Sequence, residues 1–340
     1  MENISFVFQN KKISQVKIYN YIDKFHKFNN FFIDDIWIKI LERFCQSTLK
    51  KAFSCLDRYK SYFIIHDIFK LCLINKKFNN LINIHIKPII FNENNLNDIR
   101  EISLYWSEKT KLENIIIVFD KILEKKGWKD FFDKSINIIK EIDKKLSPDY
   151  DKVNIWPTPD KVFYAMLITP LTSIKVIIIG ADPYPSPNVA MGLAFSHMNS
   201  YGKIQPSLKN IYKELMDCGY KCDLKSGNLT KWAQEGVFLI NTALTVRERQ
   251  SKSHYKIWEQ FTSNLFTYLS QKCENLVIIM WGLDAKSYKN KFDKNKHKFL
   301  ESGHPSPLNT TGDFFDEKHF LKANEILKEW GKKEIDWNLI

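Results

Sequence analysis

The feature that most constrains the fold is an alternation of short strand-like runs with longer helical patterns over the C-terminal two thirds of the chain. Short apolar runs occupy residues 175–179, 237–240, 276–280 and 298–300. Apolar residues recur at helical spacing over residues 207–218, 258–272 and 317–330. Such alternation predicts a three-layer α/β/α fold, with a short parallel sheet between helices.

The N-terminal third has a different pattern. Residues 33–45 and 69–84 carry apolar residues at helical spacing, and a polar run, NENNLN, follows at 92–97. We therefore predict a helical extension over residues 1–95, a linker over 96–124 and an α/β domain over 125–340.

Composition sets weaker limits. The excess of 51 Lys and Arg over 39 Asp and Glu leaves a net charge of +12, which favours a polyanionic partner but equally fits a solvated basic surface. The N-terminus carries no secretory pattern and no apolar run reaches the ~18 residues that span a bilayer, so we expect an intracellular protein, nuclear or in a cytoplasmic viral or replication compartment. Scattered cysteines give no metal-ligand spacing, and we expect neither metal nor cofactor.

A stiff loop follows the first strand of the α/β domain. Its sequence, Gly-Ala-Asp-Pro-Tyr-Pro-Ser-Pro over residues 180–187, fixes Asp182 at a strand end, where ligands of parallel sheets bind. Taken alone, the loop could equally be a proline-rich turn in which Asp182 caps the next element.

Four further motifs follow in order. They are GLAFS at 192–196, QPSLKNIY at 205–212, GVFLINTALTVR at 236–247 and GHPSPLN at 303–309. The ordered set resembles the family 1 uracil-DNA glycosylases, whose segments read GQDPYH, GLCFS, PPSLxNIY, LLLNxxLTV and HPSPLS. The resemblance covers about two thirds of the chain and implies a hydrolase that flips deoxyuridine out of DNA, releases uracil and leaves an abasic site.

The resemblance implies catalytic roles for two residues. Cleavage of the N-glycosidic bond puts positive charge on the sugar and negative charge on the base, so the site must oppose both. Asp182 would position or activate the attacking water and stabilise the cationic sugar. His304 would donate a hydrogen bond, as a neutral imidazole, to the uracil oxygen that becomes anionic. A surface aspartate and a structural histidine are the alternatives.

The same resemblance implies a uracil-binding set. Phe195 would stack on the base, and the Asn241 amide would distinguish uracil from cytosine. Tyr184 would fill the space of a thymine methyl group, and the Ala181 backbone N–H would address uracil. Core packing and a strand-end turn are the alternatives for Phe195 and Asn241.

A DNA-binding set completes the implied site, acting on single- and double-stranded DNA. Leu308 would enter the minor groove and fill the space of the flipped nucleotide, although an exposed leucine is common. Phosphate contacts and compression of the strand are implied for Pro206, Ser207, Pro305, Ser306 and Pro307.

Three positions depart from the family pattern. Ala181 stands where the family has Gln, Pro185 where it has His, and Asn309 where it has Ser. Pro185 removes a polar partner beside Asp182 and is similar to the Pro that ends this loop in poxvirus members. Because no departure removes the acid, the pocket Phe, the pocket Asn or the His, we expect activity.

Two alternatives stay open. Ala181 and Pro185 are compatible with a DNA-anchoring or processivity subunit of a replication complex that has weak glycosylase activity. The N-terminal extension faintly resembles an F-box module, over about fifty residues, which would bind a protein partner such as a ubiquitin-ligase adaptor; an unspecialised helical extension is the other explanation.

Overall fold

The computed structural model describes residues 111–150, 152–198 and 203–340. The predicted extension of residues 1–95 and the start of the predicted linker lie outside the described residues.

The centre of the domain is a four-stranded parallel sheet with strand order β3-β2-β5-β6. The strands are β2 (Val176–Gly180), β3 (Val237–Asn241), β5 (Val277–Trp281) and β6 (Lys298–Ser302). Every residue of β2, β3 and β5 is buried, because a parallel strand inside such a sheet is covered on both faces. All four predicted strands are confirmed.

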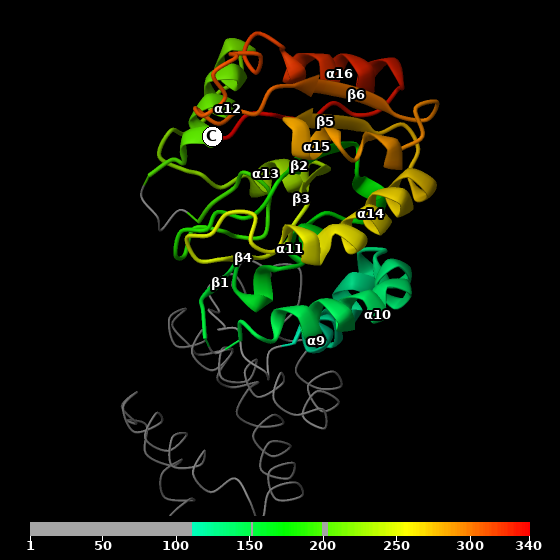
Figure 1. The fold of residues 1–340 in the computed structure, drawn as a ribbon. Helices are drawn as coiled ribbons and strands as arrows, with labels where there is room; N and C mark the ends of the chain where they lie inside the picture. The colour runs from blue at the N-terminus through cyan, green and yellow to red at the C-terminus, as the bar shows by residue number, and fades with distance from the viewer. Residues whose placement is uncertain (1–110, 151, 199–202) are drawn as a thin grey trace, which may run out of the picture.

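Helices flank this sheet (Figure 1). The longer ones are α9 (Leu112–Lys125), α10 (Lys129–Leu146), α12 (Pro206–Asp217), α14 (Tyr255–Lys272) and α16 (His319–Glu329). Short helices are α11 (Tyr164–Ile168), α13 (Thr230–Gln234) and α15 (Leu283–Lys286), with 3-10 turns at Pro159–Lys161, Leu171–Ser173 and Lys289–Lys291. The three predicted helices appear as α12, α14 and α16, so the predicted fold class is confirmed.

A two-stranded antiparallel sheet lies apart from the central one. It pairs β1 (Ile155–Trp156) with β4 (Val246–Arg247). This pairing joins the segment that follows α10 to the segment that follows β3.

Helix α9 corrects the predicted linker. Leu112, Ile115, Phe119 and Leu123 recur at helical spacing and are at most 1% exposed, within the same core as the sheet. The Asp143 carboxylate on α10 accepts the N–H groups of Leu112 and Glu113, at 2.9 and 3.2 Å, and so caps the start of α9. Residues 112–124 therefore belong to the α/β domain and not to a linker.

Aromatic rings fill the space between α10, α14 and the sheet. Trp128 stacks on Phe238 of β3 at a centroid distance of 5.2 Å, and Phe131 meets Phe261 of α14 edge-on at 5.3 Å. This aromatic packing holds α10 and α14 against the sheet, so that the loops at the carboxyl edge of the sheet start from rigid positions. No helix among the described residues has the length and apolar content to cross a membrane.

Candidate active site

A pocket of about 170 Å³ lies at the carboxyl edge of the sheet. This is where the crevice of an open parallel sheet accepts ligands. The residues of the predicted site that line it are Ala181, Asp182, Tyr184, Phe195, Ser207, Asn241 and His304. They come from loops far apart in the sequence, and the parallel strands bring them to one edge.

Asp182 stands in the loop after β2, and one of its oxygens is held by a distant segment. Ser251 Oγ and the Lys252 backbone N–H donate to Asp182 Oδ2 at 2.8 and 2.6 Å. Neither contact uses Oδ1. The carboxylate is thus oriented by protein donors while its second oxygen is left for another partner.

His304 follows β6, and its surroundings fix both its charge and its tautomer. The Ser306 backbone N–H donates to His304 Nδ1 at 3.0 Å, so a neutral ring carries its proton on Nε2. Burial lowers the pKa of His304 below its ordinary value, which keeps the ring neutral at pH 7. His304 is therefore a neutral donor at the pocket wall.

Asn241 ends β3 directly beside Gly180, its register partner on β2. A Cβ on Gly180 would lie 2.2 Å from Asn241 Oδ1, so only glycine leaves room for this amide. Asn241 is 7% exposed, and no hydrogen bond joins its side chain to any residue that the structure describes. An amide in this state has its donor and acceptor available to a ligand.

Phe195 has a strained backbone, with φ of +62° in the left-handed region. The Tyr184 hydroxyl donates to the Phe195 carbonyl at 2.9 Å and helps to hold this conformation. Burial raises the pKa of Tyr184, so the phenol stays protonated and can donate. The Phe195 ring lies 5.5 Å from the ring of Trp281 and 6.0 Å from that of His304.

Ala181 contributes its backbone. Its carbonyl accepts from the Ala243 N–H at 2.9 Å and from Thr242 Oγ1 at 2.7 Å. These bonds tie the loop after β2 to the loop after β3. The Ala181 backbone is therefore held in place by these bonds, without a longer side chain at this position.

The loop after His304 carries the predicted DNA-binding residues. Leu308 is 90% exposed, and its N–H donates to Ser306 Oγ at 3.2 Å. Asn309 donates from its amide to the His304 carbonyl at 3.0 Å, and Asn210 of α12 donates to the Pro305 carbonyl at 2.7 Å. Pro206 opens α12 next to Ser207 of the pocket. The loop that presents Leu308 is thus braced from both sides.

Sequence reasoning missed Ser251, Lys252 and Asp284. Ser251 and Lys252 hold Asp182, and the Lys252 ammonium pairs with Asp284 of α15 at 2.6 Å. No periodicity or motif marks these residues, because Ser251 and Lys252 lie 69 and 70 positions from Asp182 along the chain and Asp284 lies further still. Only the fold brings them together.

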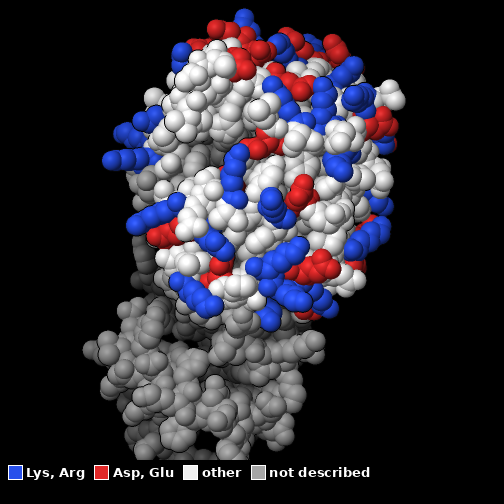
Figure 2. All heavy atoms as spheres, in the orientation of Figure 1, with Lys and Arg blue, Asp and Glu red and all other residues white. Residues whose placement is uncertain are grey.

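Charge on the described surface is mixed. Figure 2 shows Lys and Arg interspersed with Asp and Glu over this face, so the basic excess is not gathered into one patch in this view. Among the described residues, no group of three or more His, Cys, Asp and Glu side chains could hold a metal ion.

The arrangement suits a small planar polar ligand. The pocket lining includes the carboxylate of Asp182, the neutral imidazole of His304, the amide of Asn241 and the aromatic ring of Phe195. An anion and an opposed donor can together stabilise charge separation across a breaking bond. The fold and the pocket define an α/β protein with a small polar and aromatic pocket at the carboxyl edge of its sheet.

Comparison with known proteins gives the family. Residues 168–328 match the uracil DNA glycosylase superfamily. The chain is 41% identical over 220 residues to the uracil-DNA glycosylase of Fusobacterium nucleatum, which covers 64% of this chain and 94% of that protein. It is 42% identical over 235 residues to the uracil-DNA glycosylase of Campylobacter jejuni, covering 67% of this chain and 100% of that protein.

A solved structure supports the same family assignment. The crystal structure of mimivirus uracil-DNA glycosylase matches with a TM-score of 0.60 and 32% sequence identity, over 66% of this chain and 93% of that one. The chain belongs to the uracil-DNA glycosylase superfamily. None of these three names supports the alternative of a DNA-anchoring subunit.

Proposed function

We propose that this chain hydrolyses the N-glycosidic bond of deoxyuridine in DNA, releases uracil and leaves an abasic site, as a family 1 member of its superfamily. The observation that carries the proposal is the pocket in which Asp182 and His304 stand with Asn241 and Phe195. The identity of 41% and 42% to relatives named uracil-DNA glycosylase supports the same conclusion.

The two proposed catalytic residues divide the charges of the reaction. As the bond between C1′ and N1 breaks, Asp182 Oδ1 orients the attacking water and opposes the positive charge on the sugar. The His304 Nε2–H donates to the uracil oxygen that gains negative charge. A donor placed in advance in this way contributes roughly 10²–10³ in rate.

The proposed base pocket selects uracil through shape and polarity. Phe195 stacks on the ring, Asn241 pairs with its polar edge, and the Ala181 N–H meets an oxygen. Tyr184 occupies the space that a thymine methyl group would need. Because no hydrogen bond joins the Asn241 side chain to a described residue, its amide is available to pair with uracil.

The proposed DNA grip uses the loops beside the pocket. Leu308, which is 90% exposed, enters the minor groove and fills the vacated space. Backbone and hydroxyl groups contact the phosphates on either side, from Pro206, Ser207, Pro305, Ser306 and Pro307. These contacts are expected with single- and double-stranded DNA.

An oligonucleotide with one uracil tests this function. The purified full chain is incubated with the end-labelled strand, abasic sites are cleaved with hot alkali, and thymine and cytosine strands serve as controls. We expect cleavage at uracil alone, and its loss in Asp182→Asn. Tight, salt-sensitive DNA binding without any cleavage would contradict the proposal and favour a DNA-anchoring role.

The N-terminal extension is proposed to bind a protein partner, in the manner of the F-box modules that it resembles, within an intracellular compartment. Support comes from the sequence alone. A pull-down with the full chain and with a chain lacking residues 1–95 tests it. A partner retained by both forms, or by neither, would contradict this role.

A further inference from the structure

Residues 249–252 form hydrogen bonds with the loop that carries Asp182. The Arg249 N–H donates to the Pro185 carbonyl at 2.9 Å, while Ser251 Oγ and the Lys252 N–H donate to Asp182. The family pattern has a polar side chain at position 185, and this chain has proline. The hydrogen bonds that orient the acid here come from a segment far along the chain.

The backbone that supplies these donors is strained. Lys252 has φ of +62° and Arg249 has φ of +59°, both in the left-handed region that non-glycine residues seldom adopt. In this conformation the Lys252 N–H reaches Asp182 Oδ2 at 2.6 Å. A strained residue persists only where its surroundings hold it in place.

The Lys252 side chain provides such a hold. Its Nζ lies 2.6 Å from Asp284 Oδ2 on α15, and a hydrogen bond to this carboxylate raises the pKa of Lys252, so the ammonium keeps its charge. Helix α15 begins just after Gly282, where a Cβ would lie only 3.0 Å from His304 Cβ. The ion pair thus links the segment that holds Asp182 to the element that packs against His304.

We propose that the Lys252–Asp284 ion pair is a positioning clamp for the catalytic acid. By fixing the Lys252 backbone, the clamp holds Asp182 through two donors and sets its place relative to His304. Lys252 and Asp284 are positioning residues in this account, since neither is proposed to touch the substrate. Besides burial, which lowers the pKa of His304, Asp284 raises this pKa and Lys252 lowers it, so the loss of both charges together removes two opposed effects. The inference rests on the proposed function.

The test compares four variants of the full chain in the uracil assay under single-turnover conditions. Lys252→Met removes the charge but keeps the backbone N–H, Asp284→Asn removes the other partner, and a double variant combines them. Lys252→Arg keeps a cation that can pair with Asp284. KM is measured in parallel, together with binding to a thymine-containing duplex at several salt concentrations.

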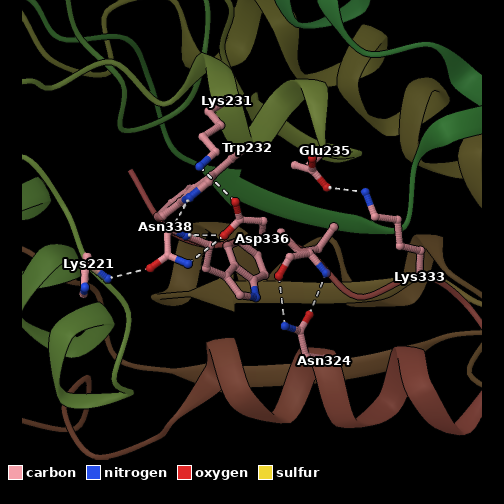
Figure 3. A network of polar contacts seen from close by, with 10 residues as sticks. Lys221, Lys231, Trp232, Glu235, Asn324, Lys333, Asp336 and Asn338 are labelled. Carbon is pink, nitrogen blue, oxygen red and sulfur yellow. Dashed lines mark hydrogen bonds and ion pairs between the residues drawn. The ribbon is translucent and has the colours of Figure 1, made fainter. Parts of the chain in front are cut away.

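A matched control comes from another ion pair. Lys231 and Asp336 lie 2.9 Å apart, with side chains 39% and 46% exposed, against 55% and 34% for Lys252 and Asp284. Lys231→Met therefore removes a similar partly exposed pair, in the polar network of Figure 3. This variant shows how much the loss of a surface ion pair away from the pocket lining changes the single-turnover rate.

We expect Lys252→Met and Asp284→Asn each to lower the single-turnover rate about tenfold, because small displacements of a reacting group are costly. The double variant should be no slower than either, Lys252→Arg should recover most of the rate, and Lys231→Met should match wild type. A rise in KM and a weaker salt dependence with an unchanged rate would overturn the clamp and make Lys252 a phosphate contact. Loss of rate in Lys231→Met as well would overturn it in favour of a general stability effect.

The activity of the wild-type protein distinguishes failure of the proposed function from failure of the proposed clamp. Wild-type turnover with four unaffected variants overturns only the clamp. Absence of wild-type turnover overturns the proposed function, and the clamp falls with it.

Discussion

A poorly exposed asparagine amide lies at the candidate pocket and another at the C-terminal segment, but the two amides differ in their hydrogen bonding. The C-terminal segment, residues 331–340, is held by Asn324 of α16, whose amide donates to the Ile335 carbonyl at 3.0 Å and accepts from the Ile335 N–H at 2.9 Å (Figure 3). In the pocket, the Asn241 amide has no partner among the described residues. The Asn241 amide lines the pocket and is not among the fully buried unpartnered groups, so it remains available to a ligand.

Backbone strain differs between the two regions as well. The left-handed residue of the C-terminal segment is Gly331, for which the conformation costs little. At the pocket, Phe195 and Lys252 adopt it. One region is built for stability and the other holds groups where a reaction would need them.

The largest expected effect comes from removing both proposed catalytic groups. Asp182→Asn with His304→Ala should lower the rate of uracil release by about 10⁴-fold or more, since the acid and the opposed donor act together. Circular dichroism and binding to a thymine duplex should stay close to wild type, because neither side chain is part of the core. Near-normal turnover would refute the assigned chemistry.

The C-terminal segment should respond in stability instead. Trp337 is fully buried against Trp232 and Phe320, at centroid distances of 5.2 and 5.0 Å. Trp337→Ala should lower the free energy of unfolding by about 3–5 kcal/mol, as deletion of a buried aromatic ring does. Urea unfolding measures this loss, while the rate per folded molecule should not change.

Trp337→Phe is the matched control for that deletion. It keeps a ring and removes an Nε1–H that is buried without an acceptor in the described protein, so it should cost much less. An equal loss of stability in both variants would show that ring packing is not what this residue contributes.

A smaller effect should follow from adding one methyl group at the pocket. In Gly180→Ala the new Cβ would lie 2.2 Å from Asn241 Oδ1, so the amide must move. We expect uracil release to slow about 10- to 100-fold, as for other displaced catalytic groups. Adding Asn241→Ala to Gly180→Ala should slow uracil release little further. If the double variant instead lost the product of the two single-variant fold-changes, Gly180→Ala would not act by displacing the Asn241 amide.

The smallest expected effect is the pH dependence between pH 8 and pH 6.5. Burial lowers the pKa of His304, so the ring stays neutral through the pH at which an ordinary histidine takes up a proton. The single-turnover rate should therefore change less than about twofold over this range and fall only at more acid pH, as the imidazole protonates. An inflection at or above pH 6.5 that His304→Gln abolishes would contradict the neutral donor.

Much of the fold could be predicted from local sequence, as could several residues that line the pocket, whose roles stay predictions. The apolar runs that became β2, β3, β5 and β6 are short and bounded by loop residues, so their period and length identify them. The loop at 180–187 and the motif at 303–309 carry enough ordered letters to mark Asp182 and His304. The linker was predicted from the polar run at 92–97, which does not specify where the next element begins, and helix α9 starts at Leu112.

The sequence by itself therefore determined the parallel sheet, the family and the residue types of the pocket, since these depend on local periodicity and on order along the chain. Tertiary structure alone decided that Ser251 and Lys252 hold Asp182, that Ser306 fixes the His304 tautomer, and that Gly180 makes room for Asn241. The physical reason is that hydrogen-bond geometry and steric room depend on distances in space between segments, and separation along the chain does not specify those distances.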